Sequence, residues 1–358
     1  MFPPVPRMTE PPMSLSAPEL KSILQTVTAG SALSAAEAES VFDHIISGEA
    51  TPVWMASFLT ALQTRGVVAE EVAGGVRALR KAMIPVSSRE GAPLIDTCGT
   101  GGGTVTTFNI STAAALVAAG AGARLAKHGN RSFTSRSGSA DVLEALGVGI
   151  ELTPERMGQV LDEVGIVFMF APLLHPAMRH VGPVRRELGI RTVMNLLGPL
   201  TNPAGVKRQV VGVSDPDLLP LIAGALRELG HERALVAHGE PGMDEISPLG
   251  TTLIHELRDG ELQEYEIRPE ALGLELHTPS GLEGGEPEDN AARVLAVLSG
   301  EARGVARSAV LLNAGAALYV ADIAASLFDG VAAAAAAVDD GRAMAKLDAL
   351  RAATASAV

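Results

Sequence analysis

The sequence is poor in several kinds of residue, and each shortage argues against a class of protein. It has one cysteine, Cys98, so no disulfide can form within the chain. Phe, Trp and Tyr make up only 3% of its 358 residues, too few for the aromatic platforms that stack single-stranded nucleic acid. Its longest apolar runs are rich in alanine and glycine and are too short to cross a bilayer.

Positive charge is also in short supply. There are 28 Lys and Arg against 41 Asp and Glu, a net charge of −13. Such a surface disfavours nucleic acid and anionic membranes, although a local basic site can still bind a small anion. The first residues lack the basic-then-apolar order of a secretory signal. We therefore expect a cytoplasmic protein with no nucleic-acid or membrane partner.

The N-terminal part of the chain has the pattern of a small helical domain. Residues 1–15 are rich in proline and are predicted to be a disordered leader. Residues 16–85 repeat apolar positions at spacings of three and four. Ser34 and Glu37 fit a capping box, and Thr51, followed by proline, fits the start of another helix.

From residue 86 to about 350 the pattern changes to short apolar runs that alternate with helices. This alternation predicts a large α/β domain with a central, mostly parallel sheet flanked by helices. Residues 175–203 are expected to pack back onto the helical domain, residues 281–290 to form a loop, and the last seventy residues to be helical. The candidate strands are residues 94–96, 124–126, 164–170, 209–213 and 234–237.

The first candidate site is a glycine-rich loop between a strand and a helix, 96-DTCGTGGGTVTTFNIST-112. A strand, a glycine turn and a helix start together form a common phosphate site, because backbone N–H groups and the helix dipole favour an anion. The loop is not a Walker loop, because no Gly-Lys-Ser/Thr closes it. It also departs from GxGxxG, because position 104 is threonine. The alternative is an ordinary tight turn between a strand and a helix.

Three further clusters carry polar groups that suit a phosphorylated ligand. The stretch 127-KHGNRSFTSRSGSAD-141 supplies cations and hydroxyls to phosphate, or else is a solvated turn. The adjacent Asp244 and Glu245 suit Mg²⁺, or else begin a helix. In the stretch 175–203, Arg185, Arg186 and Arg191 could pair with a carboxylate, or else the stretch is structural.

Together these motifs resemble the anthranilate phosphoribosyltransferase family. The resemblance covers residues 16–348 and rests, in the family's order, on GTGG-x(4)-TFNIST, KHGNRSFTSRSGSADVLEALG, FAPLLHPAMRHVGPVRRELGIRTVMNLLGPLTNP, HGEPGMDEIS and AVLLNAGAALYVA. It implies transfer of the phosphoribosyl group of phosphoribosyl pyrophosphate (PRPP) to anthranilate, with Mg²⁺ and release of pyrophosphate. It also implies a small helical domain beside a large α/β domain, and a homodimer that forms through the helical domain.

The resemblance also implies the residues of the site. Contacts to PRPP are expected from Gly99, Gly102, Gly103, Thr107, Asn109, Ser111, Thr112, Lys127, His128, Gly129, Asn130, Arg131, Ser132, Phe133, Thr134, Ser135 and Ser139. Contacts to anthranilate are expected from Gly99, Asn130 and Arg185, with His128 beside them, and contacts to magnesium from Ser111, Asp244 and Glu245. No dedicated catalytic base is expected, since an aromatic amine can attack without one.

One departure from the family separates this chain from the usual pattern. The family's loop normally reads GTGGDG, whereas here it reads GTGGGT, with Gly103 in place of the aspartate and Thr104 in place of the next glycine. Two other functions remain open: a pyrimidine nucleoside phosphorylase, and a non-catalytic nucleic-acid-binding relative. The PVRRELGIRT stretch and the acidic pair favour the transferase over the first, and the net charge argues against the second.

Overall fold

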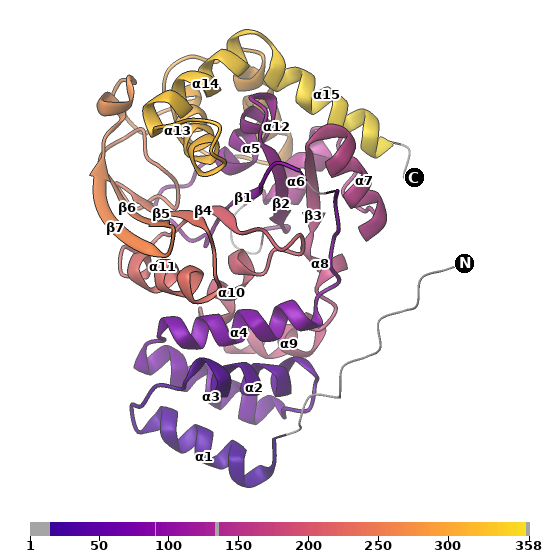
Figure 1. Cartoon of the computed structure of the whole chain (residues 1–358), viewed down its shortest axis with the longest axis vertical. Helices are drawn as coiled ribbons and strands as arrows, with labels where there is room; N and C mark the ends of the chain where they lie inside the picture. Colours follow the sequence, from indigo (N-terminus) through magenta and orange to yellow (C-terminus); the bar gives the residue numbers. More distant parts are fainter. Residues whose placement is uncertain (1–14, 90, 133–135, 356–358) are drawn as a thin grey trace.

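The computed structural model describes residues 15–89, 91–132 and 136–355. A bundle of N-terminal helices lies beneath an α/β body, as Figure 1 shows. Ser34 and Glu37 form the predicted capping box at the second helix, and Thr51 caps the third by accepting a hydrogen bond from the Trp54 amide. The bundle consists of α1 (Ala17–Thr28), α2 (Ala35–Ile46), α3 (Pro52–Arg65) and α4 (Ala69–Ala82).

The α/β body is built on a seven-stranded sheet in the order β3-β2-β1-β4-β5-β6-β7. The first five strands in this order pair in parallel, and the last two pairings are antiparallel. The strands are β1 (Leu94–Gly99), β2 (Arg124–Gly129), β3 (Ile166–Phe170), β4 (Arg208–Gly212), β5 (Arg233–Gly239), β6 (Thr252–Arg258) and β7 (Glu261–Ile267).

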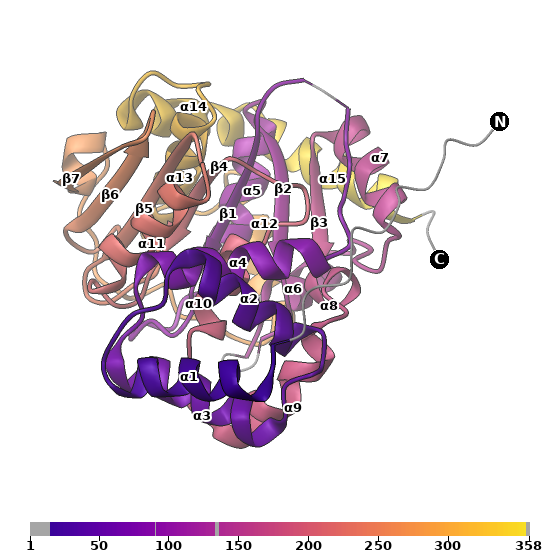
Figure 2. The ribbon, with the colours of Figure 1, turned by 60° about the horizontal axis from the view of Figure 1, so that its bottom comes forward.

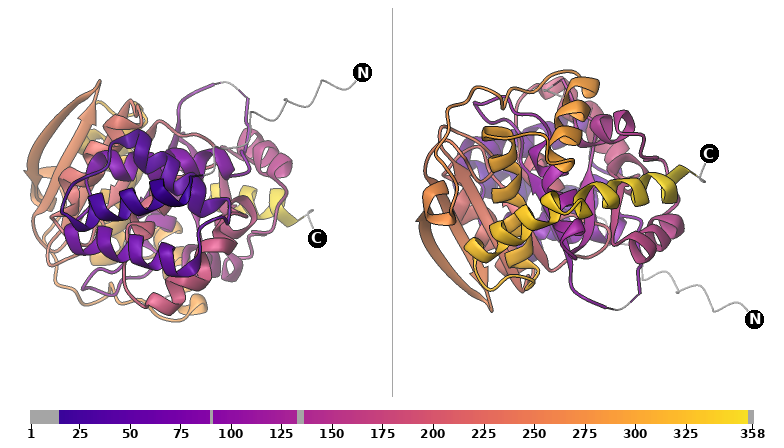
Figure 3. Two further views of the ribbon diagram at one scale, coloured as in Figure 1. Left: turned by 90° about the horizontal axis from the view of Figure 1, so that it is seen from below. Right: turned by 90° about the horizontal axis from the view of Figure 1, so that it is seen from above.

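Helices cover both faces of the sheet, and the views in Figures 2 and 3 show them from below and above. On one face α5 and α13 pack on the central strands, and α15 lies across α5; on the other, α11 packs on β5 and β6. The remaining elements are α5 (Ile110–Gly120), α6 (Ser139–Ala145), α7 (Pro154–Val164), α8 (Ala171–Leu174), α9 (Met178–Leu188), α10 (Met194–Leu200), α11 (Leu218–Glu228), η1 (Pro269–Leu272), α12 (Pro287–Leu298), α13 (Val305–Val320), α14 (Leu327–Asp339) and α15 (Arg342–Ala355).

Two hydrophobic cores result from the alternation of side chains along the strands. Val210 of β4 and Leu235 of β5 point into the core beneath α5 and α13. Their neighbours Val211 and Val236 point into the opposite core, which also contains Phe42 and the other buried residues of the N-terminal helices. The helical bundle therefore shares its core with one face of the sheet.

The chain between β3 and β4 connects the bundle to the sheet. Helix α9 packs on α2 and α3, and α10 packs on α4. These contacts bring residues 175–203 onto the N-terminal helices, beside the ends of the central strands. The fold class predicted from the sequence, a helical domain with a mostly parallel α/β domain, is confirmed.

Several local predictions need correction. Residues 281–290 are not all loop, because α12 begins at Pro287, where proline is favoured in a first helical turn. The strand predicted from residue 164 begins at Ile166, since Val164 ends α7 and Gly165 caps it with φ +85°. The β6–β7 hairpin was not predicted. The leader falls almost wholly outside the described residues, and no helix among those described is long and apolar enough to cross a membrane.

Candidate active site

A cleft of about 700 Å³ lies at the carboxyl ends of the central strands. From β1 the sheet continues to β2 and β3 on one side and to β4 and β5 on the other. Ligands of open α/β sheets bind at this kind of switch point, beyond the carboxyl ends of the strands. The parallel strands therefore place the loops that follow β1 and β2 at the same edge of the sheet.

The glycine-rich loop after β1 is held in place by Arg191. Its guanidinium donates hydrogen bonds to the carbonyls of Thr100 and Gly101, each at 3.0 Å. Gly102 adopts φ +84°, and a Cβ there would overlap this guanidinium. The absence of a side chain at position 102 thus has a direct steric reason. Arg191 was predicted to pair with a carboxylate, but it binds the backbone of the loop instead.

Asp244 packs against the ends of β1 and β4. Its Oδ2 accepts a hydrogen bond of 2.8 Å from the Gly101 amide. A Cβ on Gly99 or on Gly212 would overlap Asp244, so the carboxylate and its backbone occupy space that side chains would otherwise fill. The turn that carries it follows β5 and leads into β6, so the alternative of an acidic pair at a helix start is wrong.

The two acidic residues form a buried, like-charged pair. Burial is the main cause that raises the pKa of each carboxyl, and the charge of Asp244 raises that of Glu245 further. The Thr107 hydroxyl donates to Oε1 of Glu245 at 3.4 Å. The other oxygen of Glu245, Oε2, is buried and has no partner among the described residues. Two buried carboxylates with an unsatisfied oxygen fit a divalent cation, which would neutralise them.

Lys127 lies near the carboxyl end of β2 and is buried, only 3% exposed. Its Nζ donates to the Thr97 carbonyl at 2.7 Å and lies 3.4 Å from the Ser111 hydroxyl, which lines the same cleft. Burial lowers the pKa of Lys127, and the nearby carboxylate of Asp96 opposes that shift. A solvated turn does not describe this lysine, because its ammonium is directed at the floor of the cleft.

Asp96 is a buried carboxylate that sequence reasoning missed. Its Oδ2 accepts a 2.8 Å bond from the Asn202 amide, and its Oδ1 accepts a 3.3 Å bond from the backbone of His128. Burial raises the pKa of Asp96 to about 6, while the charge of Lys127 lowers it. The carboxylate therefore ties the end of β2 to β1 behind the cleft. No spacing pattern marked it in the sequence.

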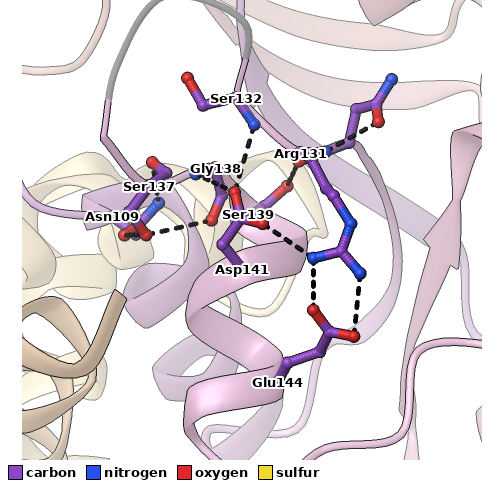
Figure 4. Close-up of polar contacts among 9 residues, drawn as sticks. Asn109, Arg131, Ser132, Ser137, Gly138, Ser139, Asp141 and Glu144 are labelled. Carbon is purple, nitrogen blue, oxygen red and sulfur yellow. Dashed lines mark hydrogen bonds and ion pairs between the residues drawn. The ribbon is translucent and has the colours of Figure 1, made fainter. Parts of the chain in front are cut away.

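Asp141 of α6 binds two described residues that follow β2, Ser132 and Gly138, as Figure 4 shows. Its Oδ2 accepts bonds from the amides of Ser132 at 3.2 Å and Gly138 at 2.8 Å. Arg131 donates to Asp141 and Glu144, each at 2.9 Å. Arg131 lines the cleft, but its charge is balanced by two carboxylates, as for an ordinary surface arginine.

The start of α5 is joined to this loop. The Asn109 amide donates to the Ser137 carbonyl at 3.2 Å, and the Ser137 hydroxyl donates to Asn109 Oδ1 at 3.3 Å (Figure 4). The two loops that end β1 and β2 are thereby held side by side. Phe133, Thr134 and Ser135 of the predicted site lie outside the described residues.

A second, smaller cavity of about 370 Å³ adjoins the cleft. Its lining is mainly apolar, and it extends toward α8 and α9. The two cavities share the lining residues His128, Asn130, Arg185, Met194 and Gly198. The Arg185 guanidinium has no hydrogen-bond or ion-pair partner in residues 15–89, 91–132 and 136–355, and partial burial lowers its pKa. An unpaired guanidinium in an apolar cavity is suited to a ligand carboxylate.

Two histidines meet in this second cavity. The Nε2 atoms of His128 and His175 are 3.1 Å apart. Burial lowers the pKa of His128 to about 3 and that of His175 to about 4. Both rings are therefore neutral near pH 7. His175 was not singled out from the sequence, where it appears only as one member of a structural stretch.

Most of the predicted site residues come together. Those that line the larger cleft are Gly99, Gly102, Asn109, Ser111, Thr112, Lys127, His128, Gly129, Asn130, Arg131, Ser139, Arg185, Asp244 and Glu245. Three described residues do not line it: Gly103, Thr107 and Ser132. The lining also includes Cys98, Thr100 and Asn195, which were not predicted. These three residues line the cleft because the fold brings their segments to it, and a pattern within one sequence does not reveal which segments meet.

Comparison with known proteins agrees with this geometry. Residues 91–344 match the α/β domain of a glycosyl transferase family, and residues 21–83 match its helical bundle domain. An anthranilate phosphoribosyltransferase of Rubrobacter xylanophilus is 53% identical, over 92% of this chain and 96% of its own. The crystal structure of the enzyme of that name from Thermus thermophilus is 46% identical with a TM-score of 0.88, covering 93% of this chain and 99% of its own.

A more distant relative has been solved with ligands. The anthranilate phosphoribosyltransferase of Saccharomyces cerevisiae in complex with PRPP and Mg is 27% identical, with a TM-score of 0.86, covering 95% of this chain and 99% of its own. The family assignment rests on the high sequence identity to these relatives over nearly the whole chain and on the matches to both domains. The chain belongs to the anthranilate phosphoribosyltransferases of this glycosyl transferase family.

Proposed function

We propose that the protein transfers the phosphoribosyl group of PRPP to the amine of anthranilate in tryptophan biosynthesis. The products are N-(5-phosphoribosyl)anthranilate and pyrophosphate. The observation that carries this proposal is the junction of two cavities: a polar cleft with amides, Lys127 and an acidic pair, and an apolar cavity with the unpaired Arg185. One suits a sugar diphosphate, and the other suits an aromatic carboxylate.

On the PRPP side, the proposed ligands are backbone amides and a small number of charged groups. The amides of the glycine loop and the start of α5 would donate to the diphosphate, where the helix dipole favours negative charge. Lys127, held at the floor of the cleft, would stabilise charge that develops on the leaving pyrophosphate. Removing one such preorganised donor typically costs about 10²–10³ in turnover.

Asp244, Glu245 and Ser111 are the residues that would hold Mg²⁺. The unsatisfied Oε2 of Glu245 and the raised pKa of both carboxyls favour a cation there. When bound, Mg²⁺ would act as a Lewis acid that neutralises charge on the diphosphate. Because Mg²⁺ prefers one or two carboxylates plus waters and substrate phosphates, two protein carboxylates are a sufficient set.

On the anthranilate side, Arg185 would bind the carboxylate and Asn130 would contact the ring substituents where the cavities join. The neutral rings of His128 and His175 add no charge that would compete with Arg185. The amine would attack C1 of the ribose as the C1–oxygen bond to pyrophosphate breaks, and the extra N–H proton would then be lost to water. Catalysis would therefore come mainly from holding two substrates in line.

The test is an assay that follows the loss of anthranilate fluorescence with PRPP and Mg²⁺. The proposal predicts turnover that needs all three components. A parallel assay with a pyrimidine nucleoside and phosphate should show no phosphorolysis. Phosphorolysis without consumption of anthranilate would overturn the proposal and favour the nucleoside phosphorylase.

We further propose a cytoplasmic homodimer, with a division into a leader (1–15), a helical domain (16–85) and an α/β domain (86–350). The support for the dimer is the family's usual interface and a groove between α1 and α3 in which Val27, Ala56 and Ala61 lie among polar residues. At the start of α3, Val53 is 79% exposed. Light scattering after size exclusion should give twice the mass of the chain. Val53→Asp should favour the monomer, and an unchanged mass would place the interface elsewhere.

A further inference from the structure

Thr104 joins the glycine loop to the turn that carries the acidic pair by two hydrogen bonds. Its hydroxyl donates a 2.7 Å hydrogen bond to the Pro241 carbonyl, and its backbone amide donates a 2.9 Å bond to the Gly242 carbonyl. Both acceptors lie within three residues of Asp244. A side chain and a main-chain amide of one residue thus hold two neighbouring carbonyls of the same turn.

The turn is shaped to receive this threonine. Gly242 adopts φ +108°, and a Cβ there would overlap the Thr104 side chain. A Cβ at Gly103 would lie 2.9 Å from the Gly242 carbonyl, which is too close, so the loop backbone lies directly on the turn. Thr104 itself is not among the residues with positive φ, so threonine costs no backbone strain here. The two segments fit one another closely at residues 103, 104 and 242.

A second link between loop and turn lies deeper in the cleft. The Gly101 amide donates to Asp244 Oδ2 at 2.8 Å. In the proposed reaction the Gly101 amide would donate a hydrogen bond to the diphosphate, and the Asp244 carboxylate would coordinate the cation. The hydrogen bond between them therefore has to break when substrate binds. The bonds of Thr104 involve neither group, and they can persist.

We propose that Thr104 is a positioning residue, which keeps the glycine loop and the acidic turn at a fixed separation while PRPP and magnesium enter between them. It touches neither reacting atom. It acts through the backbone of residues 99–103 on one side and through the turn at 241–245 on the other. This inference rests on the proposed function of the cleft as a site for a magnesium diphosphate.

The test compares three variants of the full-length protein. Thr104→Val removes the hydroxyl donor but keeps the shape, Thr104→Ser keeps the donor, and Thr106→Val is the matched control. Thr106 lies in the same loop and is exposed, and its hydroxyl has no hydrogen bond to a described residue. A thermal melt of each variant shows that its fold is kept.

The first readout is calorimetric binding of magnesium pyrophosphate, which involves no turnover. Loss of one hydrogen bond corresponds to about a two- to twelve-fold change in an equilibrium constant. Thr104→Val should therefore bind several-fold more weakly, and Thr104→Ser and Thr106→Val should bind like the parent. The second readout is amide hydrogen exchange of residues 100–105 in the free protein, which should be faster in Thr104→Val alone.

Steady-state kinetics complete the test. Thr104→Val should raise the KM for PRPP several-fold and leave the KM for anthranilate unchanged. If Thr104→Val matches Thr106→Val in pyrophosphate affinity and in exchange, the inference is wrong even though the cleft binds its ligand. If the parent protein itself binds no magnesium pyrophosphate, the proposed function fails first, so the two failures are distinguishable.

Discussion

Replacing Arg185 by alanine tests the division of the site into two substrate cavities. Arg185 stands at the junction of the cavities, and no described residue pairs with its guanidinium. A substrate carboxylate would be its first partner. The substitution should therefore affect anthranilate, which has a carboxylate at this point, far more than PRPP.

The size of the effect follows from the kind of bond lost. Hydrogen bonds to a charged group contribute about 1.5–3 kcal/mol, which corresponds to roughly a 10- to 150-fold rise in the KM for anthranilate. The KM for PRPP should change by less than about three-fold, because its proposed ligands lie on the loops after β1 and β2. Since Arg185 loses no protein partner, the free energy of unfolding should change by less than about 1 kcal/mol.

Fluorescence assays with each substrate varied at saturating amounts of the other would measure both KM values. Arg186→Ala is the matched control, because Arg186 is the adjacent residue on α9 and is exposed. Arg185→Lys should fall between the parent and Arg185→Ala, since lysine keeps the charge but not the planar fork. An equal rise of both KM values in Arg185→Ala, or the same loss in Arg186→Ala, would refute the reasoning.

Three further predictions concern charge in the two cavities. Changing Asp244 and Glu245 together to alanine should reduce magnesium-dependent turnover by more than about 100-fold, and retained activity would count against the assignment. The same change should raise the melting temperature, because it removes a buried pair of like charges. Gly103→Asp should shift the half-saturating Mg²⁺ concentration, because a Cβ there lies 3.5 Å from Asp244 Oδ1 and only 2.9 Å from the Gly242 carbonyl, so the turn that carries Asp244 has to move; an identical titration curve would show that the position is neutral. Because the pKa values of His128 and His175 are lowered to about 3 and about 4, the unfolded chain takes up protons first as the pH falls through 6.5; stability measured with urea should decrease by about 1 kcal/mol per ring from pH 6.5 to 5.5, and less in His175→Phe.

Sequence patterns predicted the parts of the fold that depend on local chemistry. The capping box at Ser34, the glycine loop after β1 and the cationic end of β2 are each encoded within a few residues, and each lies where the pattern placed it. The β6–β7 hairpin was missed even though Asp259 and Gly260 form a two-residue turn of a type favoured in hairpins. The strand β7, ELQEYEI, carries three glutamates and is largely exposed, so it lacks the continuous apolar run that marks a central strand such as β3, IVFMF.

The site was predictable where the family motifs carry it and unpredictable where distant segments meet. Asp96 and Arg191 both shape the cleft, yet their partners are far away in sequence: Asn202 for Asp96, and Thr100 for Arg191. Such pairings depend on which strands become neighbours in the sheet. Arg131 was expected to contact phosphate, but it also forms ion pairs with Asp141 and Glu144 of α6, which are close to it in sequence.

The most direct test of the account is a calorimetric titration of PRPP into the purified protein with and without Mg²⁺. PRPP should give saturable heat that depends on Mg²⁺, because loop amides, Lys127 and a cation held by the acidic pair would bind the diphosphate together. Binding should weaken strongly in the protein with both Asp244 and Glu245 changed to alanine. Absence of heat with PRPP and Mg²⁺, from protein shown to be folded, would contradict the account.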